Sequence, residues 1–348
     1  MKISMDNLSN RQKILLTLLI REYVSSAQPV GSQLLVEKYN LDMSSATVRN
    51  ELGALTDLGY LKQPHTSAGR IPTENGYRFF VSRLLEDSEL PLNTRRTISH
   101  QFYQSHQDVE QWLRLAASVL AQQSRGASLV TSPRPKQSRF KHLELVSTHG
   151  YQVLMVLVLM GGGIHQRLLT TQDLVNQEDL SQAANRVTQL CTGCDVEGLA
   201  SARAQFNVFE QGIADMVIEE MNRADSTITG EIFLDGLSNV MAEPEFVGTE
   251  EGRRALKVFE ERSILDDLIT RTTLSNNATG VHVLIGGEGT WDILRDCSIV
   301  LARYGTPGIT IGTLGVLGPM RMPYGHTIST VRFVADLLSD LVSDTLTD

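Results

Sequence analysis

The chain has 348 residues, of which 41% are hydrophobic and 20% are charged. This length and composition predict two or three domains with packed cores, and they exclude collagen-like, disulfide-scaffold and wholly disordered proteins. The three cysteines indicate a reducing compartment, and the longest aliphatic run, residues 153–160, is too short for a membrane span of about 20 residues. We therefore expect a cytoplasmic protein with no membrane partner.

Charge is distributed unevenly along the chain. Residues 1–85 carry ten Lys or Arg and seven Asp or Glu, for a net charge of +3. The remaining residues carry 21 basic and 33 acidic side chains, for a net charge of −12, and the whole chain therefore carries −9. A mildly basic head on an acidic body permits a nucleic-acid module, although a charge of +3 is also compatible with chance.

The N-terminal part of the chain predicts three helices. A capping box at Ser9 starts the first helix, which should end before Pro29. A second short helix is expected over residues 32–39, and a third should begin at Ser44 or Ser45. Two short helices with a tight connection are typical of a helix-turn-helix, whose second helix enters the DNA major groove.

Helical periodicity divides the third helix into two faces. The expected core face consists of Val48, Leu52, Leu55 and Leu58. The opposite side and the start of the helix carry small and polar residues, namely Ser45, Ala46, Thr47, Arg49, Asn50 and Gly53. An Asn amide can pair with adenine, an Arg guanidinium with guanine, and Ala or Thr methyl groups can contact thymine. A solvated amphipathic helix fits the periodicity about as well, but it would normally carry long Lys and Glu side chains.

Residues 59–73 predict a β-hairpin, because two short extended segments flank a glycine-containing turn. Directly after the third helix, such a hairpin would be the wing of a winged helix. The side chains expected to contact phosphates or a minor groove are Lys62, His65, Thr66, Ser67 and Arg70. For His65 alone, a plain surface histidine is the alternative interpretation.

These segments closely resemble a known family. The stretches SATVRNEL (45–52), PHTSAGRIPT (64–73) and GYRF (76–79) are similar to those of the bacterial heat-inducible transcription repressors, the HrcA family. The resemblance implies a homodimeric repressor that binds double-stranded DNA at an inverted-repeat operator upstream of chaperonin and DnaK operons, and that is associated with the nucleoid when bound. It also implies modulation by the chaperonin GroEL, so that unfolded proteins occupying GroEL relieve repression.

The acidic body predicts strands near both of its ends and a helical block between them. We therefore expect an α+β protein whose sheet domain carries an insertion. Periodicity indicates the interruption, but it neither identifies the fold of the sheet domain nor locates the borders. The resemblance implies an N-terminal winged helix-turn-helix (1–85), a GAF-like α/β sheet domain in two segments (94–170 and 275–348), and an inserted, mainly helical dimerisation domain (171–274).

Other chemistry finds little support in the sequence. Cys191 and Cys194 have the spacing of half a zinc site or of a redox pair, but no matching second ligand pair follows, so ordinary thiols are favoured. No nucleophile and base stand out together, so we expect no enzyme activity, no metal site and no cofactor. Two alternatives stay open: a winged-helix repressor gated by a small molecule in the GAF-like domain, and, more remotely, an enzyme with a DNA-binding head.

Overall fold

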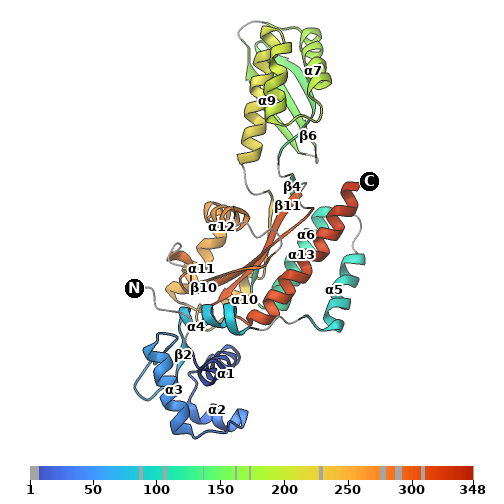
Figure 1. Cartoon of the computed structure of the whole chain (residues 1–348). Helices are drawn as coiled ribbons and strands as arrows, with labels where there is room; N and C mark the ends of the chain where they lie inside the picture. Colours follow the sequence, from blue (N-terminus) through green and yellow to red (C-terminus); the bar gives the residue numbers. More distant parts are fainter. Residues whose placement is uncertain are drawn as a thin grey trace. The chain divides into compact units, whose positions relative to one another are not determined.

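The computed structural model describes residues 8–85, 89–104, 108–135, 137–160, 163–171, 174–226, 230–274, 280–286, 292–306 and 310–347. The fold combines helices and sheets, as the sequence predicts (Figure 1). Contacts within the chain define two units: the first contains Met1–Thr131, Ile232–Tyr304 and Thr313–Asp348, and the second contains Ser132–Glu231 and Gly305–Gly312. Within the described residues, no helix is long and apolar enough to cross a membrane.

Three helices form the N-terminal part of the first unit, which we call the head (residues 8–85). They are α1 (Asn10–Ser26), α2 (Ser32–Tyr39) and α3 (Ser45–Asp57). The predicted capping box is present, because the Ser9 hydroxyl accepts from the Gln12 N–H at 3.2 Å and the Gln12 side chain accepts from the Ser9 N–H at 3.0 Å. Ser44 caps α3 by accepting from the Thr47 N–H at 3.1 Å. Local capping and apolar spacing therefore determine where these helices begin.

A short antiparallel hairpin follows α3, with β1 (Leu61–Lys62) paired to β2 (Ile71–Pro72). Glycine is required beside this hairpin at Gly69, where a Cβ atom would collide with the Val30 backbone. The head then ends with α4 (Glu74–Phe79) and a π-helical turn (Phe80–Leu84).

The rest of the first unit, which we call the body, is built around an antiparallel sheet. Its strands, in spatial order, are β8 (Ile232–Asp235), β3 (Ala127–Thr131), β11 (Thr310–Pro319), β10 (Cys297–Tyr304) and β9 (His282–Ile285). Strand β10 alternates between the two faces, since Val300 packs in one buried cluster and Leu301 in another. Both faces are therefore covered.

Helices form the outer layers of the body (Figure 1). One face packs against α6 (Val109–Ser124) and α13 (Tyr324–Thr347), and α5 (Leu92–Gln104) lies against α6. The opposite face packs against α10 (Leu237–Met241), α11 (Glu250–Glu260) and α12 (Arg262–Leu274). This three-layer packing buries both faces of the sheet.

The second unit has its own three-stranded antiparallel sheet and its own apolar core. Its elements are β4 (Arg134–Pro135), β5 (Phe140–His149), β6 (Gln152–Leu159), β7 (Ile164–Thr170), α7 (Gln177–Cys191), α8 (Val196–Ala202) and α9 (Val208–Ser226). The buried side chains of β5 and β6 pack with those of α7 and α9. One face of this sheet is thus covered by helices.

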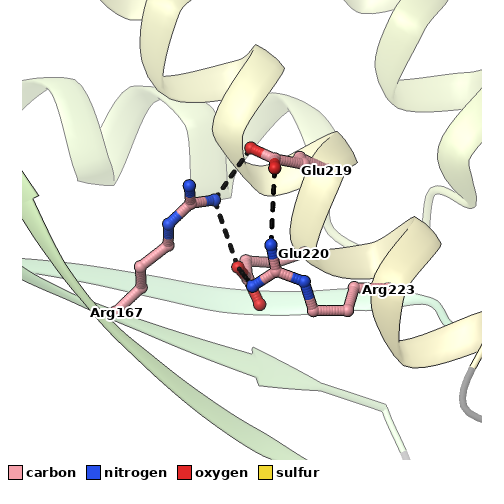
Figure 2. Close-up of polar contacts among 4 residues, drawn as sticks. All are labelled: Arg167, Glu219, Glu220 and Arg223. Atoms are coloured by element: carbon pink, nitrogen blue, oxygen red, sulfur yellow. Dashed lines mark hydrogen bonds and ion pairs between the residues drawn. The ribbon is translucent and has the colours of Figure 1, made fainter.

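Ion pairs hold α9 against this sheet. Arg167 on β7 contacts Glu219 at 2.8 Å and Glu220 at 3.2 Å, both on α9 (Figure 2). Arg223 approaches the same two carboxylates from within α9, at 3.4 Å and 2.8 Å. Glu220 is buried, so its charge depends on these two guanidinium groups.

The observed units differ from the domain borders expected from the sequence. The expected insert (171–274) excludes β5, β6 and β7, yet these strands pair with one another and pack on α7 and α9 in the second unit. Conversely, α11 and α12 cover the body sheet and belong to the first unit. The two divisions differ because strand partners, and not helical periodicity, decide which contact unit a segment joins.

Candidate nucleic-acid interface

Helix α3 has a buried face and an exposed face. Val48, Leu52 and Leu55 are buried, as predicted. Leu58 is 41% exposed, so its expected place in the core was wrong. The helix ends at Asp57, and Leu58 forms the C-cap, where the chain no longer follows the helical spacing.

The exposed face carries the small and polar side chains expected there. Ser45, Ala46, Arg49 and Asn50 are exposed, whereas Thr47 and Gly53 are half-buried. The Thr47 hydroxyl lies 2.9 Å from the Ser44 hydroxyl, so Thr47 also takes part in the cap. A Cβ atom added at Gly53 would meet nothing within 4 Å, which shows that this side of α3 is open. A flat, uncovered helix face of this kind can approach another surface closely.

The loop of the hairpin presents several hydrogen-bond donors. Lys62, His65, Thr66 and Ser67 are all exposed. Gln63, which the sequence interpretation overlooked, shapes this loop by donating to the Thr66 carbonyl at 2.9 Å and to the Ala68 carbonyl at 3.0 Å. The only signal for Gln63 in the sequence is an amide side chain at the base of a tight turn, which is weak by itself.

Arg70 has a different position from the other predicted contact residues. Its Nε donates to the Thr56 hydroxyl at 3.0 Å, and its backbone pairs with that of Val30 through hydrogen bonds of 2.8 and 2.9 Å. Arg70 is half-buried. The residue therefore anchors the hairpin to α3 and to the segment before α2, which brings the loop and the helix into one surface.

Further contacts stiffen the support of this surface. The Thr73 hydroxyl donates to the Gly59 carbonyl at 2.6 Å and accepts from the Gly76 N–H, which joins the hairpin to α4. Between α1 and α2, the buried carboxylate of Glu22 accepts from Lys38 at 2.7 Å. This hydrogen bond raises the pKa of Lys38. The exposed face of α3 therefore rests on a braced three-helix support.

The arrangement supplies hydrogen-bond donors and positive charge, from Arg49, Lys62 and Arg70 among others. Within the residues that the structure describes, no group of three or more His, Cys, Asp or Glu side chains could hold a metal ion. Cys191 is buried at the end of α7, and this burial, together with the neighbouring Cys194, raises its pKa to about 11. A thiol with this pKa is a poor nucleophile at neutral pH.

Comparison with known proteins decides the family. Residues 110–328 match the family model described as "HrcA protein C terminal domain". A relative from Roseiflexus castenholzii, named heat-inducible transcription repressor HrcA, is 43% identical over 346 residues, which covers 97% of this chain and 95% of the relative. The chain belongs to the HrcA family. The resemblance seen in the sequence motifs is thereby confirmed.

Other HrcA relatives agree over nearly the whole chain. A protein of the same name from Chloroflexus aggregans is 42% identical over 355 residues, covering 97% of this chain and 93% of its own length. A crystal structure described as that of a hypothetical protein at 2.2 Å resolution has a similar fold, with a TM-score of 0.61 and 23% identity. The match covers 97% of this chain and 100% of the crystallised chain. At this identity the likeness shows a shared fold and no more.

Proposed function

We propose that this HrcA-family chain is a heat-inducible transcription repressor whose head is a winged helix that binds operator DNA. The observation that carries the proposal is the open face of α3 beside the donor-rich hairpin loop, joined by the contact between Arg70 and Thr56. In a winged helix, the helix in the position of α3 enters the major groove. Family membership supports the same role.

Each exposed group then has a definite task. Arg49 and Asn50 face base edges, and Ala46 and Gly53 let the helix backbone lie deep in the groove. Lys62, His65, Thr66 and Ser67 contact phosphates or the minor groove through the wing. These last contacts position the protein, whereas the contacts from α3 provide sequence preference.

We further propose that the repressor acts as a homodimer assembled through the second unit. One recognition helix reads only part of a helical turn, so a specific operator requires two half-sites and a two-fold symmetric protein. The face of the β5–β6–β7 sheet opposite α7 and α9 carries both apolar and polar side chains, and its exposed apolar members include two residues of β7. Ile164 is 63% exposed and Leu168 is 56% exposed, and register places them beside Val158 and Leu154 of β6.

The body sheet with its helices on both faces is proposed to be the GAF-like domain. The operator is proposed to be an inverted repeat upstream of chaperonin and DnaK operons.

We also propose that GroEL modulates the repressor. Exposed apolar side chains, such as Tyr103 (90%) and Val208 (87%), offer the kind of surface that chaperonins bind. The resemblance of the head motifs to the family supports the proposed operator and the proposed modulation by GroEL.

Operator binding by the full chain tests the proposal. Asn50→Ala should weaken binding to the chain's own operator by about 1–3 kcal/mol and relax the preference at one base position. Asn75→Ala is the matched control, because Asn75 is an exposed amide in α4, outside the proposed surface. Equal loss on operator and scrambled DNA would contradict the groove assignment.

A second measurement addresses GroEL. Footprints of the purified protein on its own promoter, with and without GroEL, should show greater protection when GroEL is present. Addition of an unfolded competitor protein should reverse that gain. If GroEL leaves the footprint unchanged, the proposed modulation is wrong, while the DNA-binding proposal stands on the Asn50 result.

A further inference from the structure

A cavity of about 360 Å³ lies in the first unit, between the head and the body. Helix α1 contributes Ile20, Arg21 and Val24 to its wall. The π-helical turn and the residue after it contribute Phe80 and Leu85, and the other wall is formed by residues 322–326, which lead into the first turn of α13. Its size falls within the range of small-molecule sites, about 300–1,000 Å³.

The junction around this cavity is otherwise well packed. The rings of Tyr77 on α4 and Tyr324 on α13 lie 5.9 Å apart, and both side chains are buried. Arg78 donates to the Ile285 carbonyl at the end of β9, at 3.1 Å. Apolar residues of the head and of the α13 layer also belong to one continuous cluster. The cavity is therefore a gap within an extensive contact.

The polar groups of the wall favour an anion. Arg21 and His326 line the cavity, and none of the ten described residues that line it is acidic. Gly325 and His326 lie in the first turn of α13, a helix of 24 residues. Backbone N–H groups in the first turn have no acceptor within the helix, and the helix dipole favours negative charge there. The remaining wall is largely apolar.

We propose that the cavity binds a small amphipathic carboxylate, with its anionic group toward Arg21 and the first turn of α13 and its apolar part against Ile20, Val24 and Phe80. Because α1 belongs to the head and α13 to the body, the bound molecule stabilises the docked arrangement by mass action. The expected effect of the bound carboxylate on operator binding rests on the proposed function. Linkage then requires that the carboxylate and the operator alter each other's affinity by the same factor.

Calorimetric titration of the full chain tests binding directly. Benzoate and octanoate are the probes, and benzamide and octanamide are their neutral counterparts. The carboxylates should bind, and the amides should bind at least about tenfold more weakly, because they lack the charge-assisted contacts. Absence of carboxylate binding, or equal binding of the amides, overturns the proposal.

Variants of the lining residues test whether the carboxylate binds in this cavity. Arg21→Ala should weaken carboxylate binding at least about tenfold, and Val24→Trp should abolish it by filling the space. Arg11→Ala is the matched control, since Arg11 is an exposed arginine of the same helix that does not line the cavity. Arg21 is itself exposed, so its removal should leave the fold intact even if Val24→Trp fails to fold. Binding unaffected by Arg21→Ala would overturn the site.

Operator affinity, measured with and without saturating octanoate, tests the coupling. We expect a change of at least about fivefold, which Arg21→Ala should remove. If octanoate binds and operator affinity stays the same, the coupling is wrong. If octanoate binds and the protein has no operator affinity at all, the proposed repressor function fails while the carboxylate site stands.

Discussion

Gly53 illustrates how much one residue on the open face of α3 determines. A glycine inside a helix costs about 0.5–1 kcal/mol relative to alanine, and the space beside Gly53 would accept a methyl group without a clash. The glycine therefore lowers helix stability without a steric reason within the chain. The proposed close approach of the α3 backbone to a DNA groove would supply a reason outside the chain.

Gly53→Ala should therefore raise the free energy of unfolding by about 0.5–1 kcal/mol and weaken operator binding. Urea unfolding and fluorescence anisotropy measure the two effects. Gly212→Ala in α9 is the matched control, because a Cβ there would also meet nothing within 4 Å. The control should gain similar stability with unchanged operator affinity. Unchanged operator binding by Gly53→Ala would place this face outside the groove.

The thiol of Cys191 has a pH-dependent effect at the same scale. Burial raises its pKa from an ordinary value of 9.0 to about 11 in the folded chain. The unfolded chain therefore loses this proton first, so the stability contributed by the neutral thiol declines as pH rises from about 9 to about 11. Urea unfolding across that window should show a steeper alkaline loss in the wild type than in Cys191→Ala. Equal slopes would contradict the raised pKa. Cys297, whose pKa burial raises to about 12, is present in both proteins and does not affect the comparison.

Single elements of the second unit depend on partners from other elements. Helix α9 is tied to β7 by Arg167, which reaches both Glu219 and the buried Glu220 (Figure 2). The first of these contacts, a hydrogen bond from Arg167, lowers the pKa of Glu219. An interaction that spans two elements and involves a buried carboxylate contributes more than a pair within one exposed helix turn.

Arg167→Ala should accordingly destabilise the chain, since Glu220 then retains only Arg223 of its two guanidinium partners among the described residues. Arg253→Ala is the control, because its ion pair with Glu250 is exposed on both sides and lies within α11. Thermal unfolding should show a clearly lower midpoint for Arg167→Ala than for the wild type, and an unchanged midpoint for Arg253→Ala. Equal midpoints would mean that the network contributes nothing to the packing of α9.

Assembly belongs to the scale of the whole molecule. In the proposed homodimer, a second copy would cover the outer face of the sheet in the second unit. Such an interface needs apolar side chains, and Ile164 and Leu168 provide them. Charges introduced there should separate the copies without disturbing the core, since both side chains are more than half exposed.

The double variant Ile164→Glu/Leu168→Glu should sediment as a monomer and lose most of its operator affinity, because one head reads a single half-site. Val247→Glu provides the control: Val247 is 60% exposed but lies in the first unit. The control should remain a dimer. If the double variant stays dimeric, the dimer interface lies on another surface.

Local signals in the sequence were sufficient for the head. The capping box at Ser9, the end of α1 before Pro29 and the buried face of α3 depend on residues within a few positions of one another, so periodicity and capping predicted them. The head motif also indicated the family, because its long run of residues is more specific than any single helix.

Tertiary structure alone decided how distant segments combine. The strands from 140 to 170 formed a separate sheet, and α11 and α12 joined the body, since hydrogen-bond partners and apolar faces far apart in the chain select each other during folding. The anchoring role of Arg70 depends on Thr56, and the cavity depends on α1 meeting α13, and no local pattern encodes either contact. Helix formation depends on neighbouring residues, whereas packing partners lie at unrestricted sequence distance, and this difference separates what could be predicted from what had to be observed.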